Sequence, residues 1–149
     1  MSDPVTIVLL GEPVGQGRPR FVRKSGVAYT PEKTRNISAA LRIAAQQTMN
    51  ERISGLFDEP LRLHLLAEFG VPQSWSQRKK NTALLHGHFP AKKPDISNIL
   101  KLAEDALNGI VYRDDALIVE AHVRKVYGGQ PKLVITVSPL HSAIEVVPL

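Results

Sequence analysis

The sequence contains no cysteine among its 149 residues. This absence excludes a disulfide framework, a thiolate metal site and a cysteine nucleophile. Long apolar runs are also lacking, since no window approaches the ~18 residues that a membrane-spanning helix requires. The apolar run near the N-terminus has no basic segment before it, which argues against a signal peptide. We therefore expect a soluble, cytoplasmic protein that does not act at a membrane.

The length and composition limit the architecture. A chain of 149 residues, 43% of them hydrophobic, can bury a core without help from a metal or a disulfide. Domains cluster at about 100–150 residues, and no linker or repeat divides this chain. We predict a single domain over residues 1–149.

Charge is distributed unevenly along the chain. Two segments, 13–35 and 72–93, are basic and contain a single acid, Glu32, whereas segment 95–115 is mainly acidic. The basic residues that we take as candidates for DNA contacts are Arg18, Arg20, Arg23, Lys24, Arg78, Lys79, Lys80, Lys92 and Lys93. This pattern suggests a protein that holds a polyanion around a metal-binding centre. Taken alone, the charges would fit solvated loops and a charged helix face equally well.

Hydrophobic periodicity predicts strands and helices in alternation. The expected strands are 5–10, 61–71, 117–123 and 133–137; the expected helices run from the cap Thr30 to Gly55 and from Ser97 to Asn108. The last two strands are expected to form a hairpin through the turn at 127–131, and 72–90 is expected to be a polar connection. This order predicts an α+β fold, with a mixed sheet of about four strands and two helices packed on it.

The second predicted helix separates its residues into two faces. At about 100° per residue, Ile99, Leu102 and Ala106 fall on one side, and Asn98, Lys101 and Asp105 on the other. Asp95 lies just before this helix, and the pair Asp114-Asp115 follows it.

Carboxylates from two segments, with a lysine nearby, suit a Mg²⁺ phosphodiesterase site. Mg²⁺ prefers oxygen ligands and needs only one or two carboxylates beside water and substrate phosphate. The metal activates water and neutralises phosphate charge, and a lysine can stabilise the transition state. Each part also has a structural explanation: Asp95 as a helix cap, Lys101 and Asp105 as a surface pair, and Asp114-Asp115 as a turn.

The ordered pattern resembles the signature of the RusA family of Holliday junction resolvases, especially its phage and prophage members. The run Asp95-Ile-Ser-Asn-Ile-Leu-Lys101, then Asp105-Ala-Leu and Asp114-Asp115, is similar to the family's Asp-x-Asp-Asn-x-x-Lys-x-x-x-Asp-Ala-Leu followed by an Asp-Asp pair. Gly-Gln-Gly-Arg-Pro-Arg-Phe, Tyr-Thr-Pro and Pro-Gln-Ser-Trp-Ser are similar to further family landmarks. The resemblance covers about residues 5–137.

Position by position, the resemblance implies a catalytic set of Asp95, Lys101 and Asp115, with Asp95, Asp114 and Asp115 as metal ligands. The second aspartate of the family pattern falls on Ser97, which offers an oxygen but no charge. Metal affinity is therefore expected to fall unless Asp114 or Asp105 compensates. Ser97, Asn98 and Asp105 are possible supports for the metal or its water.

The resemblance further implies a homodimer that binds four-way DNA junctions and makes two related cuts with Mg²⁺, for which Mn²⁺ is a possible substitute, in DNA recombination and repair. Trp75 and Phe89 are candidates for stacking at an opened junction, although packing roles are commoner for such residues. Two alternatives stay open. The first is a branched-DNA binding protein that has lost efficient cleavage because Ser97 replaces an aspartate, and the second is a metal-dependent phosphodiesterase for another nucleic acid. We expect a bacterial or phage-encoded protein.

Overall fold

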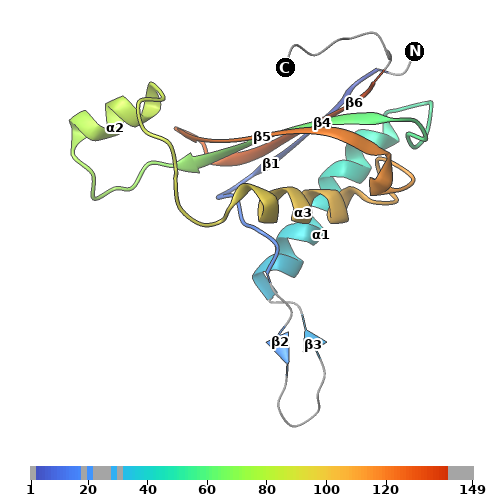
Figure 1. The fold of residues 1–149 in the computed structure, drawn as a ribbon, viewed down its shortest axis with the longest axis horizontal. Coiled ribbons are helices and arrows are strands. Elements are labelled where there is room, and N and C mark those ends of the chain that lie inside the picture. Colours follow the sequence, from blue (N-terminus) through green and yellow to red (C-terminus); the bar gives the residue numbers. More distant parts are fainter. Residues whose placement is uncertain (1–2, 18–19, 22–27, 30–31, 141–149) are drawn as a thin grey trace.

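A computed structural model describes residues 3–17, 20–21, 28–29 and 32–140 of the chain (Figure 1). Its elements, in chain order, are β1 (Val5–Leu10), β2 (Arg20–Phe21), β3 (Ala28–Tyr29), α1 (Glu32–Asn50), β4 (Leu61–Gly70), α2 (Gln77–Leu84), α3 (Ile96–Leu107), a 3₁₀ turn η1 (Asp115–Leu117), β5 (Ile118–Gly128) and β6 (Lys132–Pro139). None of the helices in these described residues is long and apolar enough to cross a membrane.

Four strands form one mixed sheet in the order β1-β6-β4-β5. Strand β6 runs antiparallel to both β1 and β4, whereas β5 runs parallel to β4. Helices α1 and α3 pack together against one face of this sheet, and the short β2–β3 ladder projects away from it (Figure 1). The predicted α+β fold with a mixed four-stranded sheet is confirmed.

The hydrophobic core lies between the sheet and the two helices. Alternate residues of β4 are buried, from Leu61 to Phe69, because successive side chains of a strand point to opposite faces. Helix α1 contributes Leu41 and Ala45, and α3 contributes its whole apolar stripe. At roughly 1.5–3 kcal/mol for each large buried side chain, this layer is what fixes α3, and hence its polar face, on the sheet.

The predicted hairpin between the last two strands is wrong. Strand β4 lies between β5 and β6, and residues 129–131 cross the end of β4 instead of forming a tight turn. Two hydrogen bonds hold this crossing: Gln130 N donates to Glu68 (3.0 Å), and Gly11 N donates to the Pro131 carbonyl (2.9 Å). Alternation identified both strands correctly but carries no information about which strand is their neighbour.

The helix predictions also need correction. The 72–90 connection, for which no helix was expected, contains a helix, α2, whose N-cap is Ser76. The described residues therefore form three α-helices and not two. Helix α1 ends at Asn50, before the predicted end at Gly55, and Ile53 beyond it is fully exposed. Helix α3 begins at Ile96, one residue earlier than predicted, and Asp95 is its N-cap, which confirms the structural explanation considered for that residue. The predicted cap of the first helix, Thr30, and Pro31 lie outside the described residues.

Candidate nuclease site

Helix α3 presents the candidate residues as its two-faced sequence predicts. Ile99, Leu102 and Ala106 are buried in the core, whereas Asn98, Lys101 and Asp105 are exposed on the opposite face. Because burial of the apolar face fixes the rotation of the helix, the side chains of Asn98, Lys101 and Asp105 form one row along its exposed face.

Lys101 and Asp105 form an ion pair one helical turn apart. The Lys101 Nζ donates to Asp105 Oδ1 at 3.1 Å. This hydrogen bond, with the charge of Asp105 and a smaller contribution from Asp115, raises the pKa of Lys101. Lys101 is therefore a fixed cation at neutral pH. A pair this exposed adds little to stability, so its position is not explained by folding.

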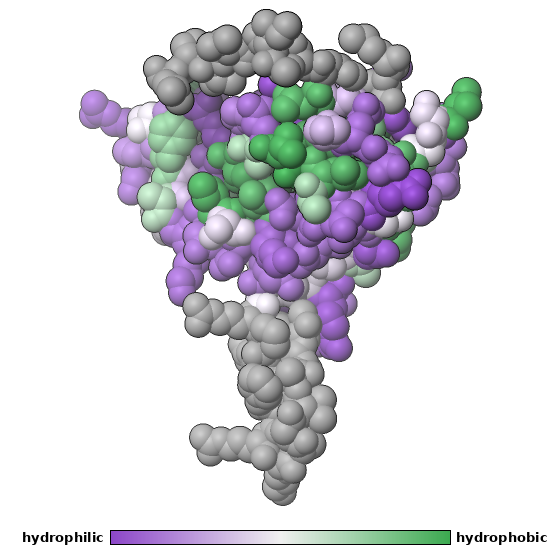
Figure 2. All heavy atoms as spheres, turned by 45° about the vertical axis from the view of Figure 1, so that its right-hand side comes forward, coloured by the Kyte–Doolittle hydropathy of each residue, from purple (hydrophilic) through white to green (hydrophobic). Residues whose placement is uncertain are grey.

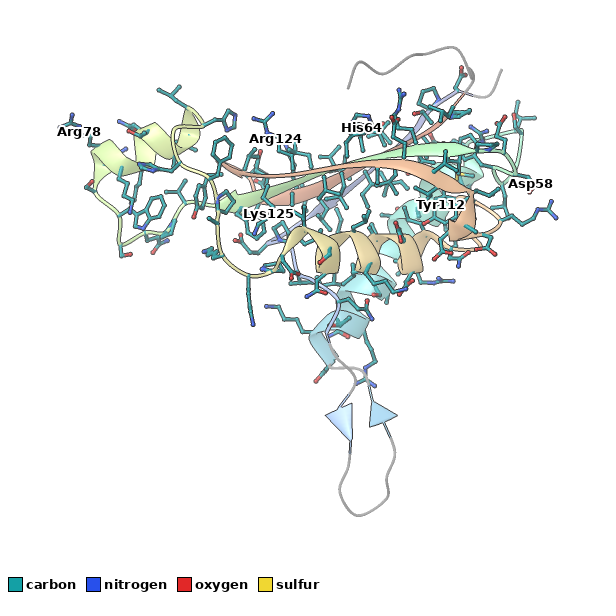
Figure 3. The ribbon with its side chains drawn as sticks, viewed as in Figure 1. Asp58, His64, Arg78, Tyr112, Arg124 and Lys125 are labelled. Carbon is teal, nitrogen blue, oxygen red and sulfur yellow. The ribbon has the colours of Figure 1, made fainter. Side chains whose placement is uncertain are left out.

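The turn that carries Asp114 and Asp115 is anchored to α3 and to the loop before β4. The buried Tyr112 hydroxyl donates to the Glu104 carbonyl at 2.7 Å, and burial raises the pKa of this phenol. Arg113 N donates to the Phe57 carbonyl at 3.0 Å, and the Arg113 guanidinium pairs with Asp58. These contacts hold the Asp-Asp pair beside the last turns of α3 (Figure 3 labels Asp58 and Tyr112).

Four acids gather at this end of α3, and we call them the acidic cluster: Glu104, Asp105, Asp114 and Asp115. Asp114 accepts from Ala116 N at 3.0 Å as the cap of η1, and this backbone bond lowers the pKa of Asp114. The hydrogen bond with Asp114 raises the pKa of Asp115, and partial burial and the charges of Asp114 and Asp105 add to the rise. Burial, then the charge of Asp115, raises the pKa of Glu104. Lys101 is the cation that offsets these charges.

Asp95 occupies the other end of α3. Its side chain accepts from Asn98 N at 3.3 Å, which is the N-cap interaction. Six residues separate it from Lys101, or about 9 Å along the helix axis. Asp95 lines an open pocket of about 780 Å³ together with Lys33, Lys93 and Asn98. Lysines beside this pocket suit an anionic ligand.

The Gly-Gln-Gly segment closes one side of this pocket. Gln16 N donates to the Asn98 carbonyl at 2.9 Å, and Gly17 N donates to Thr34 Oγ1 at 3.2 Å. A Cβ on Gly15 would lie 2.9 Å from the Cβ atoms of both Asn98 and Pro94. Only glycine permits this approach, which ties the N-terminal loop to the cap of α3.

The structure therefore divides the predicted site into two parts. Lys101, Asp105 and Asp115 come together with Asp114, whereas Asp95 lies about two turns away; the exposed Ser97 and Asn98 follow it in the first turn of α3. Within the described ranges, no three His, Cys, Asp or Glu side chains converge closely enough to form a metal cage.

The predicted basic contacts of the second segment belong to one unit, residues 72–93, which we call the basic lobe. Arg78, Lys79 and Lys80 are on α2, at the end of the molecule opposite Asp58 and Tyr112 (Figure 3). Lys92 and Lys93 are exposed where the lobe returns to α3. Trp75 is half-buried, edge-on to Tyr127 at 5.2 Å between ring centres, with Lys79 Nζ 3.9 Å from the centre of its ring. One face of Trp75 is thus already occupied by a cation.

The remaining predicted DNA contacts lie in the first basic segment. Arg18, Arg23 and Lys24 are outside the described residues, and only the backbone of Arg20, in β2, is described.

Three residues near the site were missed by the sequence reasoning. Glu104 lies within the motif and shares the face of Lys101, so its spacing could have identified it. Tyr112 lies two residues before Asp114, but no sequence pattern indicated its hydrogen bond to Glu104. Burial lowers the pKa of Lys125 in β5, and the negative charge of Asp95 acts in the opposite direction. Only the parallel pairing of β4 and β5 brings this lysine near the cap of α3, so no local pattern could have revealed it.

Known proteins match this chain over most of its length. The model of the family described as "Endodeoxyribonuclease RusA" matches residues 11–138, which is most of the chain. An uncharacterized protein of Bacillus subtilis (strain 168), YqaN, is 30% identical over 135 residues, covering 88% of this chain and 93% of that protein. The matched range includes α3, the acidic cluster and the basic lobe.

Proposed function

This chain belongs to the RusA endodeoxyribonuclease family, and from that premise we propose that it resolves four-way (Holliday) DNA junctions by metal-dependent hydrolysis of paired phosphodiester bonds. The whole chain would act as one endonuclease domain in DNA recombination and repair. The observation that carries the proposal is the grouping of Lys101, Asp105 and Asp115 at one end of α3, within a match that spans residues 11–138.

RusA nucleases depend in general on a divalent metal ion. We propose Mg²⁺ here, with Mn²⁺ as a substitute. The residues fit such an ion because the acidic cluster offers hard oxygen donors. Burial, then the charge of Asp115, raises the pKa of Glu104, and the hydrogen bond with Asp114 raises the pKa of Asp115. Mg²⁺ does not require a closed cage of protein ligands, since one or two carboxylates suffice beside water and phosphate.

Asp114 and Asp115 would hold the ion, and Asp95, about two turns away along α3, would act on it through bridging water and the bound phosphate. When bound, such an ion supplies charge neutralisation at the scissile phosphate and a more acidic water. Lys101 stays protonated at neutral pH, because its pKa is raised. Its ammonium group donates hydrogen bonds to the phosphate oxygens, where negative charge accumulates in the transition state. Asp105 orients that ammonium through their ion pair.

DNA would contact the basic lobe and the lysines of the Asp95 pocket. Lys33 and Lys93 line that pocket, and the lobe adds Arg78 and Lys80. Such phosphate contacts position a duplex without reading its sequence. The basic lobe lies at the Asp95 end of α3, so DNA bound there reaches the acidic cluster along the polar face of the helix.

We also propose a homodimer, because a two-fold assembly suits a two-fold junction. Strand β5 is an edge strand of the four-stranded sheet. Its Val119 is 61% exposed, and Ile96 of α3 is 50% exposed. Figure 2 shows apolar residues gathered in a patch that hydrophilic residues surround, as at protein contacts. Sedimentation should report a dimer at micromolar concentration; a strict monomer there would remove the route to paired cuts. We further propose that the protein acts in the bacterial cytoplasm, where its proposed DNA substrate is found, and that it is encoded by a bacterium or a phage.

A second function is favoured by a specific observation. Ser97 replaces an aspartate of the family pattern, and the described residues contain no preformed three-ligand cluster. A protein with these features would bind branched DNA and cleave it weakly or not at all.

One assay separates the two functions. Labelled four-way junction, matched duplex and single strand are each incubated with Mg²⁺ or EDTA, and binding is measured in parallel. We expect cleavage of the junction alone, and only with Mg²⁺. Tight junction binding without cleavage would instead establish the binding protein.

The metal assignment is tested by Asp95→Asn, with Asp3→Asn as the matched control. Asparagine caps a helix as well as aspartate does, so the fold should be kept. Cleavage should fall by about a hundredfold or more, the size of the loss when one preorganised electrostatic contact is removed from an active site, with junction binding unchanged or tighter. Wild-type turnover in Asp95→Asn would refute this assignment.

A further inference from the structure

The basic lobe is an ordered segment, held by specific contacts, that projects from the end of the sheet (Figure 1). Ser76 caps α2 by accepting from Lys79 N at 3.2 Å, and Ala83 is fully buried on the inner side of the helix. Trp75 fills the space between the lobe and β5, where it meets Tyr127, and its ring centre is 6.0 Å from that of His88. Because Trp75 fixes both ends of the lobe, its tip has a defined shape.

The tip is the turn that follows α2. His86 has a positive φ of 62°, and Gly87 N donates to the Thr82 carbonyl at 2.8 Å, which reverses the chain. This reversal leaves two large apolar side chains outside the core: Leu85 is 82% exposed and Phe89 is 49% exposed. Burial of apolar side chains stabilises a fold, so folding does not explain why both of these side chains are exposed to solvent at one turn.

The lobe that carries this apolar tip contains charges of a single sign. No acidic residue occurs between Glu68 and Asp95, while Arg78, Lys79, Lys80, Lys92 and Lys93 lie in that interval. Arg124 of β5 places its guanidinium carbon 5.7 Å from the centre of the Phe89 ring. In Figure 3, Arg124 on β5 lies between Arg78, at the far end of α2, and His64 of β4. An exposed aromatic ring with a cation beside it is a suitable platform for a nucleic-acid base.

We propose that Leu85 and Phe89 form a wedge that inserts at the branch point of DNA and stacks against an unpaired base. This inference rests on the proposed function and adds the feature that would distinguish a branch from a continuous duplex. The basic residues around the tip hold the phosphates on either side, and apolar side chains are the ones that DNA-deforming proteins insert between base steps. Linear duplex offers the phosphates but no opened step, so the wedge favours the junction.

The test measures DNA binding in EDTA, where cleavage plays no part. A four-way junction and a linear duplex each carry the fluorescent base 2-aminopurine, next to the branch point or at the matching duplex position. The variants are Phe89→Ala, Leu85→Ala and the double variant, and Ile53→Ala is the control because Ile53 is an exposed apolar residue outside the lobe. Phe89→Trp tests whether another aromatic ring restores the effect.

We expect wild-type protein to raise 2-aminopurine fluorescence at the branch point, since unstacking relieves its quenching. The double variant should lose this rise and about tenfold in junction affinity, while duplex affinity changes less than about twofold. Phe89→Trp and Ile53→Ala should behave as wild type.

The contrary outcomes are distinct. If the wild-type protein prefers and cleaves junctions but the double variant keeps both the preference and the fluorescence rise, the wedge is refuted and the proposed function stands. If the wild-type protein shows no junction preference, both fail. If the double variant binds DNA as wild type but sediments differently, the tip contacts a second copy of the chain. If it binds DNA as wild type but no longer binds phosphatidylglycerol vesicles, the tip contacts a lipid surface. Either result would also refute the wedge.

Discussion

Ser97 stands where the RusA pattern has an aspartate, and the structure shows that α3 does not need it as a cap. Asp95 fills that role through Asn98 N, and Ser97 is exposed in the first turn of the helix. It lies four residues before Lys101, so the two side chains share one face. A carboxylate at position 97 would therefore stand between the Asp95 pocket and the acidic cluster.

We predict that Ser97→Asp lowers the Mg²⁺ concentration for half-maximal cleavage. A screened attraction between a carboxylate and a divalent ion is worth about 1–4 kcal/mol at contact, so a shift of about fivefold or more is expected. Aspartate in the first turn also suits the helix dipole, so the melting temperature should stay equal or rise slightly.

Ser54→Asp is the charge-matched control, because Ser54 is exposed in a turn away from α3. Unaltered Mg²⁺ dependence in Ser97→Asp would mean that the acidic cluster and Asp95 already complete the site.

A second residue-scale prediction concerns Glu104. Burial, aided by the charge of Asp115, raises the pKa of Glu104 above 4.5, so the folded protein holds this proton more tightly than the unfolded chain does. The stability gained from this proton is present below the unfolded pKa and is lost as the pH rises through the folded pKa. Glu104→Gln cannot ionise, so it should melt at a higher temperature than wild type at about pH 7, and the difference should vanish near pH 4.

Thermal melting across this pH range provides the measurement, with the exposed Glu51→Gln as control. A Glu104→Gln variant that is less stable than wild type at neutral pH would show that the carboxylate is stabilised where it lies, contrary to the pKa direction.

Part of the site could be predicted at this scale and part could not. Helical periodicity correctly placed Asn98, Lys101 and Asp105 on one exposed face, because the burial of Ile99 and Leu102 determines the rotation of α3. The separation of Asp95 from Asp115 was not visible in the sequence, since it depends on the path of residues 108–114. That path is set by the burial of Tyr112 and by its bond to Glu104.

At the scale of elements, α2 depends on a glycine. A Cβ on Gly87 would lie 2.5 Å from Thr82 Cγ2 and 3.1 Å from the Thr82 carbonyl oxygen. Thr82 cannot turn away freely, because its hydroxyl donates to the Arg78 carbonyl at 2.9 Å. We predict that Gly87→Ala destabilises the end of α2 by about 1–3 kcal/mol.

Hydrogen exchange should show faster exchange in residues 77–87 with little change in β4 and β6, since α2 lies outside the layer between sheet and helices. Gly129→Ala is the matched control, because its Cβ would meet no atom within 4 Å. Unchanged exchange in α2 would mean that the turn adapts without cost.

Elements were predicted better than their pairing. Each strand of the sheet was recognised from its alternation or its apolar run, because those patterns record burial directly. The neighbour of β5 was not recognised, since alternation is the same whether β4 or β6 lies beside it. Helix α2 was missed because its exposed, polar sequence has one buried residue, Ala83, and so lacks the periodicity that identified α1 and α3.

At the scale of the whole molecule, the basic lobe and the acidic cluster lie at opposite ends of α3. This separation predicts that DNA is held mainly at the lobe, and that binding weakens steeply with salt as counterions are released. Removing one phosphate contact with Arg78→Gln should make the slope of log affinity against log salt shallower by about 1.

Arg52→Gln, which removes a charge far from the lobe, should leave the slope unchanged. A salt slope near zero in the wild-type protein would show that the lobe is not the DNA surface.

The strand order has a consequence for how the protein forms during its synthesis. Strand β4 has both of its neighbours, β5 and β6, later in the chain, and Thr6 of β1 finds its partner Thr136 in β6, 130 positions onward. No part of the four-stranded sheet can close until β5 has emerged from the ribosome, and β1 waits for β6. The backbone edges of β1 and β4 therefore remain unpaired through most of translation, which exposes the nascent chain to chaperones and makes folding slow for its size.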